Sequence, residues 1–243
     1  MRELSTGCYD RAAMALVERS FYERQGAEAL AMGREFDCSM ESTNAAVSAM
    51  TQRYTDEFAS VLDVGCGANL AYDLPLVAAG KRVVGVDFAL NFLRLAPADR
   101  HGVDLAQADA LRLPFRGNSF DAVICSETVE HVDDDRGAIS EIARILKPAG
   151  LLFFTVPTLW SAARIIEMMK TRNLTIRLME GHVREYSPRA VRKLLSPHFA
   201  IEAWYPVGCG WTGPVGKRIE SLIQSGLLRR FSKSVAVVAR KTR

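Results

Sequence analysis

Two apolar runs, each ending in a polar or glycine-rich turn, constrain the fold of this chain most strongly. The first, Val61–Val64, leads into Gly65-Cys66-Gly67, and the second, Arg82–Asp87, ends in a carboxylate about twenty residues later. Glycines after a strand let the backbone turn tightly and let a ligand approach without meeting a Cβ. A carboxylate at the end of the next strand is where nucleotide-binding α/β sheets hold ribose hydroxyls. Together these features indicate a nucleotide-binding α/β fold.

Short apolar runs of this kind alternate with helical stretches up to Pro157. The further strands that we expect are Asp104–Ala106, Phe120–Cys125 and Leu151–Val156, and the helices are Asp73–Ala79, Ala89–Leu95 and Asp134–Leu146. Lys147-Pro148-Ala149-Gly150 should stop the last of these helices and turn the chain into the next strand. Nearly continuous apolar strands suit a parallel sheet that is buried on both faces. The alternation predicts a doubly wound sheet with right-handed crossovers.

The flanks of this core look different. We expect a single domain made of a helical N-terminal cap (1–54), a core (60–156), a helical insertion (158–181) and the C-terminal part of the sheet (182–243). The elements expected in the last part are a helix at Pro188–Leu195, a strand at Ala200–Pro206, a helix near Val215–Leu228 and a strand at Ser234–Arg240. The two closing strands should pair antiparallel at one edge, which gives a mostly parallel sheet of seven strands.

Composition and cysteine spacing exclude several classes. With a formal net charge of +3 in 243 residues, the chain has no strong electrostatic reason to bind nucleic acid. The cysteine count is odd and no CxxC pair occurs, so we expect reduced thiols in a cytoplasmic protein and no metal site. No apolar run reaches the roughly 18 residues of a membrane span, and the N-terminus lacks the apolar core of a secretory signal.

The motifs resemble those of the class I S-adenosylmethionine (SAM)-dependent methyltransferases, especially the group that includes ubiquinone- and menaquinone-biosynthesis enzymes. The matching segments are Asp63–Gly67, Asp87, Ala108-Asp109-Ala110, Ser119–Cys125, Glu127–Val132 and Ile142–Gly150. The resemblance is strong over about Ser60–Val156 and loose from Gly181 to Pro206. It implies a Rossmann-like methyltransferase fold and SAM as the cofactor.

The resemblance also implies which residues hold SAM. The positions expected to contact the cofactor are Asp63, Gly65, Cys66, Gly67, Asp87, Phe88, Asp109, Ala110 and Ser126. Asp87 would bind the ribose and Asp109 would lie near the adenine amino group. Asp87 could instead cap the following helix, and Asp109 could be a turn residue. The third glycine that the family often has is missing from Ala68-Asn69-Leu70, so the methionine end of SAM is expected to be held differently.

Two histidines are candidates for a general base. His131 follows the fourth strand, at the carboxyl edge where ligands bind in open α/β sheets, and His182 follows the insertion. A hydroxyl acceptor would benefit from such a base, because the pKa of histidine is near neutral. The alternatives are a structural or cofactor-lining role for His131 and a surface loop position for His182. Glu127 and Glu130 are expected to line the same site.

The resulting hypothesis is methyl transfer to a small-molecule or lipid-like acceptor, such as a quinone or a secondary metabolite. A non-catalytic SAM-fold binding or scaffold protein and a nicotinamide-dependent dehydrogenase are the alternatives; Leu70 in the place of the third glycine disfavours the dehydrogenase. The Asn-Pro-Pro-Tyr type of motif is absent after the fourth strand, which argues against nucleic-acid substrates. The apolar residues Trp160, Ile165, Ile166 and Met169 could form a core face, a cap over the cleft or a peripheral membrane contact. The oligomeric state and the methylated atom stay open.

Overall fold

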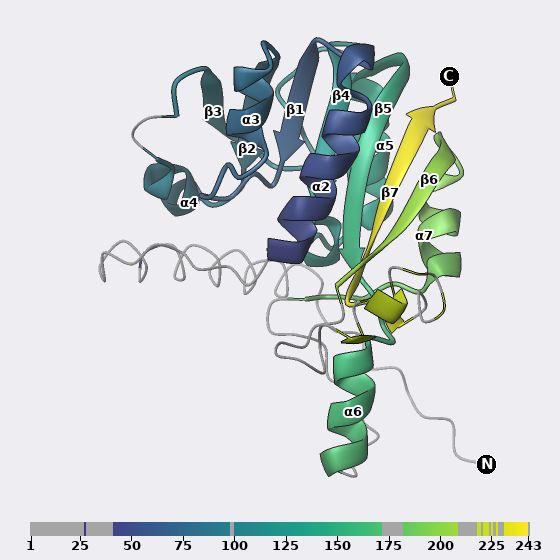
Figure 1. Ribbon diagram of the computed structural model, residues 1–243. Coiled ribbons are helices and arrows are strands. Elements are labelled where there is room, and N and C mark those ends of the chain that lie inside the picture. The colour runs from purple at the N-terminus through teal and green to yellow at the C-terminus, as the bar shows by residue number, and fades with distance from the viewer. Residues whose placement is uncertain are drawn as a thin grey trace, which may run out of the picture.

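A seven-stranded sheet forms the centre of the molecule (Figure 1). The computed structural model describes residues 27, 41–97, 100–171, 182–208, 218–219, 221–223, 225, 227 and 231–242. In sheet order, the strands are β3 (Val103–Gln107), β2 (Arg82–Asp87), β1 (Ser60–Val64), β4 (Phe120–Ser126), β5 (Leu146–Pro157), β7 (Ser234–Lys241) and β6 (Phe199–Val207). The predicted doubly wound, Rossmann-like sheet is confirmed.

Strand direction places the ends of five strands at one edge. β1 pairs parallel to β2 and β4, β2 pairs parallel to β3, and β4 pairs parallel to β5. β7 runs antiparallel to both β5 and β6, which confirms the antiparallel closing pair. Because of this reversal, Ser234 at the start of β7 lies opposite Pro157 at the end of β5. The carboxyl edge of the sheet therefore gathers the turns after β1 to β5 together with the chain entering β7.

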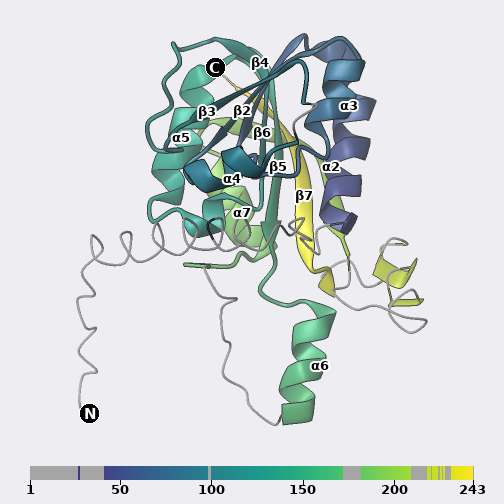
Figure 2. The same cartoon turned by 90° about the vertical axis from the view of Figure 1, so that its left-hand side faces the viewer.

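Helices cover both faces of the sheet (Figure 2). The helices α5 (Asp135–Ile145) and α7 (Pro188–Leu195) pack on one face, and α2 (Glu41–Arg53), α3 (Asp73–Ala78) and α4 (Leu90–Leu95) pack on the other. All five residues of β1 are buried, as a parallel strand covered on both faces requires. Each face has its own apolar cluster, and the sheet separates the two.

Local capping explains where two helices begin. The Asp134 side chain accepts a hydrogen bond from Gly137 N at the start of α5, and the Ser187 side chain accepts one from Ala190 N at the start of α7. Such side chains satisfy backbone N–H groups that have no partner within the helix. The predicted bounds of α7 are confirmed, and those of α3, α4 and α5 agree to within one residue.

The strand after α5 begins earlier than we expected. Leu146 already pairs with Phe120, and Leu151 pairs with Ala122, so Lys147–Gly150 bulges out opposite Asp121. Ala149 takes a positive φ of 60° in this bulge. The proline and glycine end the helix as predicted, but the strand continues through the bulge because Leu146 is fully buried beside Phe120.

Several expected segments lie mainly outside the described residues. In the N-terminal cap the structure describes the helix α2. In the insertion it describes the helix α6 (Ala162–Thr171), which projects from the carboxyl edge in Figure 1. The helix expected near Val215–Leu228 lies mostly outside the described residues, and Cys8, Cys38 and Cys209 lie outside them altogether. The two described cysteines, Cys66 and Cys125, are buried free thiols. No helix in the described part of the chain is long and apolar enough to cross a membrane.

Candidate functional site

The turn after β1 is held tightly on one side and is open on the other. Gly65 has a φ of +78°, and a Cβ placed on it would come within 2.3 Å of Thr128 Oγ1. Thr128 is fixed there because its hydroxyl lies 3.1 Å from Val64 O and 3.0 Å from Ser126 O. Gly67 also has a positive φ, but a Cβ there would meet no described atom within 4 Å. Gly65 is therefore needed for packing, whereas Gly67 borders space that a ligand can use.

Asp87 joins this turn to the end of β2. Its Oδ2 atom accepts a hydrogen bond of 2.9 Å from Gly67 N, and its Oδ1 atom accepts one of 2.8 Å from Ala89 N. The carboxylate thus takes part in starting α4 and also fixes the glycine turn. A carboxylate oxygen has two lone pairs, so an oxygen that accepts one backbone hydrogen bond can accept a second one from a ligand. Phe88, the next predicted cofactor residue, has its carbonyl bound by Gln107 Nε2 at 2.8 Å.

The other predicted cofactor residues lie along the same edge. Asp109 and Ala110 follow β3, and Asp109 Oδ1 accepts a hydrogen bond of 2.9 Å from Leu111 N, as a turn residue would. Ser126 ends β4, and its hydroxyl lies 2.9 Å from Thr155 Oγ1. The carboxyl edge therefore brings these residues to the side of the sheet that holds Gly67 and Asp87. Their contact with a cofactor stays a prediction.

Beneath the glycine turn lies a pair of buried acids. Asp63 and Asp73 are fully buried, and none of their four carboxyl oxygens has a hydrogen-bond partner among the described residues. Burial raises the pKa of Asp73 to about 7, and burial together with the neighbouring Asp73 raises the pKa of Asp63 well above its usual value. A buried carboxyl without a partner is costly, so a cation bound here would be strongly stabilised.

Sequence reasoning named Asp63 but not Asp73. The signal was present, because Asp73 begins the helix that follows the glycine turn. The missing third glycine also has a structural counterpart. Leu70 takes a φ of +48°, which glycine adopts more easily, while its side chain is almost completely buried. Burial of the Leu70 side chain thus offsets the backbone strain of its positive φ, a strain that a glycine would not have.

The turn after β4 brings further titratable groups to this edge. Glu127 has a φ of +49° and leads into a 3₁₀ turn, η2 (Val129–His131). Glu130 is fully buried, and burial and the charge of Glu127 raise its pKa. Both carboxyl oxygens of Glu130 lack a hydrogen-bond partner within the part of the chain that is described. Glu130 Oε1 lies 3.7 Å from His131 Nε2.

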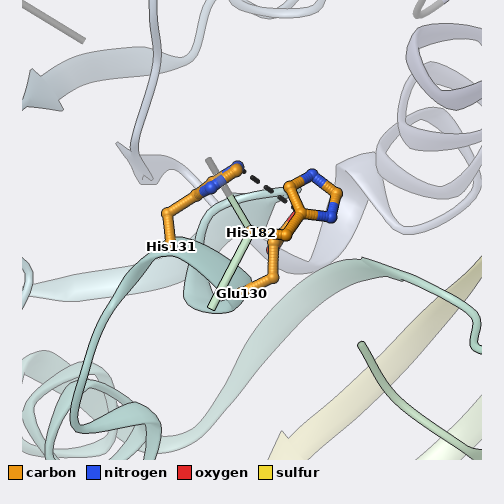
Figure 3. Close-up of side chains that lie close together, drawn as sticks. All are labelled: Glu130, His131 and His182. Atoms are coloured by element: carbon orange, nitrogen blue, oxygen red, sulfur yellow. Dashed lines mark ion pairs between the residues drawn. The ribbon is translucent and has the colours of Figure 1, made fainter. Parts of the chain in front are cut away.

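His131 and His182 meet although 50 residues separate them in the chain. Their ring centroids lie 4.7 Å apart in an edge-to-face arrangement (Figure 3). The side chain of His182 is only 10% exposed, so it is not on a surface loop as the alternative supposed. Burial, together with the charges of His131, Arg164 and Lys233, lowers the pKa of His182 to about 4.

Hydrogen bonds fix the segment that carries His182. Val183 N donates to Glu130 O at 2.9 Å, and the Arg184 guanidinium donates to Asp133 O at 2.6 Å. The Tyr186 hydroxyl binds Asp135 Oδ2 at 3.0 Å. The segment returning from the insertion is therefore docked on the turn after β4. Sequence reasoning placed each histidine near the site separately, and only the fold shows that they touch.

The same cluster bears on the expectation that the chain has no metal site. Glu130, His131 and His182 each offer one ligand atom, and these atoms all lie within 4.8 Å of one another. Cysteine spacing, on which that expectation depended, says nothing about a set of ligands drawn from histidines and a glutamate. The sequence places two of the three side by side, but the third comes from beyond α6.

Comparison with known proteins agrees with this geometry. Residues 62–154 match the family described as "Methyltransferase domain". The matched stretch is thus similar to a methyltransferase domain. It spans β1 to β5 and so contains the glycine turn, Asp87 and the turn after β4. The methyltransferase resemblance inferred from the motifs is thus confirmed.

Two curated relatives are similar over this domain. A demethylmenaquinone methyltransferase from Renibacterium salmoninarum is 39% identical over 101 residues, which cover 40% of this chain and 42% of the relative. A ubiquinone biosynthesis O-methyltransferase from Bartonella bacilliformis is 37% identical over 107 residues, which cover 42% of this chain and 43% of the relative. The chain thus matches about two fifths of the length of these relatives.

A solved structure extends the likeness to most of the fold. The magnesium protoporphyrin IX methyltransferase from Synechocystis, solved with bound SAH, has a TM-score of 0.64 and 17% sequence identity. The alignment covers 93% of this chain and 98% of that one. Residues 62–154 and the strands that follow them therefore share one Rossmann-like architecture with that protein.

Proposed function

We propose that this chain transfers a methyl group from SAM to a small-molecule acceptor of the quinone or phenol type. The observation that carries the proposal is the junction of Gly67 and Asp87, which presents an open glycine and a fixed carboxylate at the carboxyl edge. The matched methyltransferase domain and the names of the two curated relatives support the reaction and the acceptor class. Lipid-like acceptors and secondary metabolites fall within the same proposal.

The residues present fit the parts of SAM. Asp87 would accept hydrogen bonds from the ribose hydroxyls, and Asp109 with Ala110 would lie near the adenine. The methionine end carries an ammonium group and a sulfonium, both cationic. Asp63 and Asp73 provide a carboxyl pair that is buried and lacks hydrogen-bond partners among the described residues.

Positioning supplies much of the catalysis in this proposal. When bound, SAM would supply an electrophilic methyl group to the acceptor atom and would leave as SAH. The chain's own part is to hold the acceptor against that methyl at the carboxyl edge and to exclude water. A hydroxyl acceptor must also lose its proton, and the sequence points to His131 or His182 for this step. His182 is a weak base near neutral pH, because its pKa is about 4.

The first experiment measures cofactor binding. Isothermal titration calorimetry should show SAH binding and far weaker NAD binding. Asp87→Ala should weaken SAH binding by about 1–3 kcal/mol, because hydrogen-bond partners of the ribose are lost. Asp104→Ala, which removes an exposed carboxylate from β3, is the matched control and should leave the affinity unchanged. Binding of NAD in preference to SAH would refute the proposal.

The second experiment measures turnover. The protein is incubated with SAM carrying a labelled methyl group and with demethylmenaquinone or related dihydroxyaromatic acceptors. Label should appear in the acceptor and SAH should accumulate in equal amount. Tight SAH binding without transfer to any member of such a panel would favour the non-catalytic alternative.

A further inference from the structure

Asp63 and Asp73 reach the same buried place from two different elements. Side chains alternate along β1, so Asp63 shares the face of Val61, which belongs to the apolar cluster on the side of the sheet that α3 covers. Asp73 is the first residue of α3. Neither side chain is exposed to solvent, and the two carboxyl groups lie within hydrogen-bonding reach of each other. The fold therefore holds two acids together away from solvent.

The pair cannot satisfy itself as two carboxylates. A carboxylate only accepts hydrogen bonds, so neither group can donate to the other unless one of them carries a proton. All four oxygens accordingly lack a hydrogen-bond partner within the described part of the chain. Two buried negative charges in contact also repel each other strongly. A proton held between the acids removes both problems.

The described groups that act most strongly on the pair include no cation. Those that titrate are Asp87, Tyr72 and Cys66. Asp87 is a further acid, and burial raises the pKa of the Tyr72 hydroxyl and of the Cys66 thiol, so both of these groups are neutral near neutral pH. Acidic and neutral neighbours cannot balance a second negative charge. They therefore favour the pair in its protonated form.

We propose that Asp63 and Asp73 share a proton in the free protein, and that a cationic ligand binds by displacing it. The shared proton is a property of the fold alone. The displacement rests on the proposed function, in which the ammonium group of SAM or SAH lies beside the pair. On binding, the proton passes to solvent, both carboxyls ionise, and the ammonium N–H groups donate to oxygens that had no partner. One positive charge thus replaces another in the enclosed site.

This exchange makes cofactor affinity depend on pH. Burial raises the pKa of Asp73 to about 7, and burial together with Asp73 raises the pKa of Asp63 well above its usual value. Below that pH, protons compete with the ligand for the pair. The affinity for SAH should therefore fall about tenfold for each pH unit below 7 and should depend less on pH above it.

The first test counts the protons that binding releases. SAH is titrated into the full chain by calorimetry at about pH 6.5, where its amino group is still charged. The titration is repeated in buffers of different ionisation enthalpy, and the slope of the observed enthalpy against the buffer enthalpy gives the number of protons released. The unmodified protein should release about one proton for each SAH bound. 5′-Methylthioadenosine, which keeps the adenosine but has no ammonium group, should bind with little or no release.

Asp73→Asn is the deciding variant. Its amide keeps the shape of the side chain and can donate a hydrogen bond to Asp63, so Asp63 ionises without a shared proton and the release should fall close to zero. Asp63→Asn should do the same, and it serves if Asp73→Asn fails to fold. Asp121→Asn is the matched control, because Asp121 has a pKa of about 2 and is already ionised. An unmodified protein that releases no proton, or an equal release in Asp73→Asn, would overturn the proposal.

Infrared spectroscopy tests the shared proton without any ligand. A protonated carboxyl has a C=O stretching band that a carboxylate lacks. Buried Glu127 and Glu130, whose pKa values are also raised, contribute to the same region, so the spectrum of Asp73→Asn is subtracted from that of the unmodified protein. A difference band should remain at the same pH, and its absence would overturn the shared proton. If SAH does not bind at all, the proposed function and the displacement fail together, while this spectrum still decides whether the pair holds a proton.

Discussion

At the amino edge of the sheet Asp121 has a fully paired carboxylate, whereas near the carboxyl edge Asp63 and Asp73 are buried without hydrogen-bond partners among the described residues. Asp121 accepts hydrogen bonds from Ser60 N at 2.9 Å, from Ser60 Oγ at 2.7 Å and from Lys147 Nζ at 2.6 Å. Partial burial raises the pKa of Asp121, but these bonds outweigh it and hold the pKa at about 2. At the other edge, burial dominates and raises the pKa of both acids.

The contrast separates stability from function. The amino edge uses its carboxylate to join β1, β4 and the start of β5, which stabilises the fold. The carboxyl edge keeps buried acids whose ionisation is unfavourable until a cation binds beside them. Perturbed titratable groups gather at functional sites for this reason. The edge that costs stability is the one that carries the glycine turn and the histidines.

The largest effect should come from Asp73→Asn. Because its pKa is raised in the folded chain, Asp73 does not lower the free energy of unfolding below pH 4, where it is protonated in both folded and unfolded chains. Its destabilising effect then grows as the pH rises to about 7 and stays constant above that value. The variant should therefore gain about 2–4 kcal/mol of stability at pH 8 and little at pH 4. Urea unfolding of both proteins across this range measures the difference; equal gains at both pH values would contradict the assignment.

A smaller effect of opposite sign should follow from Asp121→Asn. The lowered pKa means that Asp121 stabilises the fold above pH 4 and that this contribution is lost as the pH falls through about 2. The variant should lose about 1–2 kcal/mol at pH 7, with a discount for the partial exposure of the side chain. The same urea series measures it. If Asp121→Asn instead raised the free energy of unfolding, the carboxylate at the amino edge would not be stabilising, and the two edges would not differ in this respect.

Much of the fold was accessible from the sequence because its signals are local. The strands around Val61–Val64 and Arg82–Asp87 are runs of neighbouring apolar residues, and the helix at Pro188–Leu195 has its own capping serine and proline. The start of β5 was wrong by five residues, because the bulge at Lys147–Gly150 depends on pairing with β4. Bulges of this kind are set by the partner strand and leave little trace in the strand's own pattern.

The site was accessible in parts. Gly67, Asp87 and His131 follow strand ends, so the parallel topology alone brings them to one edge. The pairing of Asp63 with Asp73 and the meeting of His131 with His182 depend on how a turn folds back and on how α6 returns. These contacts are non-local, and one side chain carries no sign of the other. The unsatisfied oxygens of Glu130 are likewise a property of the packed structure.

We expect the smallest effect on stability from substituting two glycines that lie in similar surroundings. They also provide the sharpest test of the difference between the two edges of the sheet. Gly67 and Gly80 both have positive φ, and a Cβ on either would meet no described atom within 4 Å. Gly67 lies at the carboxyl edge, whereas Gly80 lies at the amino edge between α3 and β2. Alanine at either position should cost about 1 kcal/mol, since only the backbone is strained.

Binding should separate these two variants. Gly67→Ala places a methyl group in the space beside Asp87 and should weaken SAH binding at least tenfold, because a ligand that approaches the backbone closely tolerates no Cβ. Gly80→Ala should bind SAH like the unmodified protein while showing the same loss of stability. Thermal unfolding and calorimetry on both variants provide the two measurements. Parallel losses of affinity would mean that backbone strain acts through the whole sheet, and unchanged affinity in Gly67→Ala would place the cofactor away from this turn.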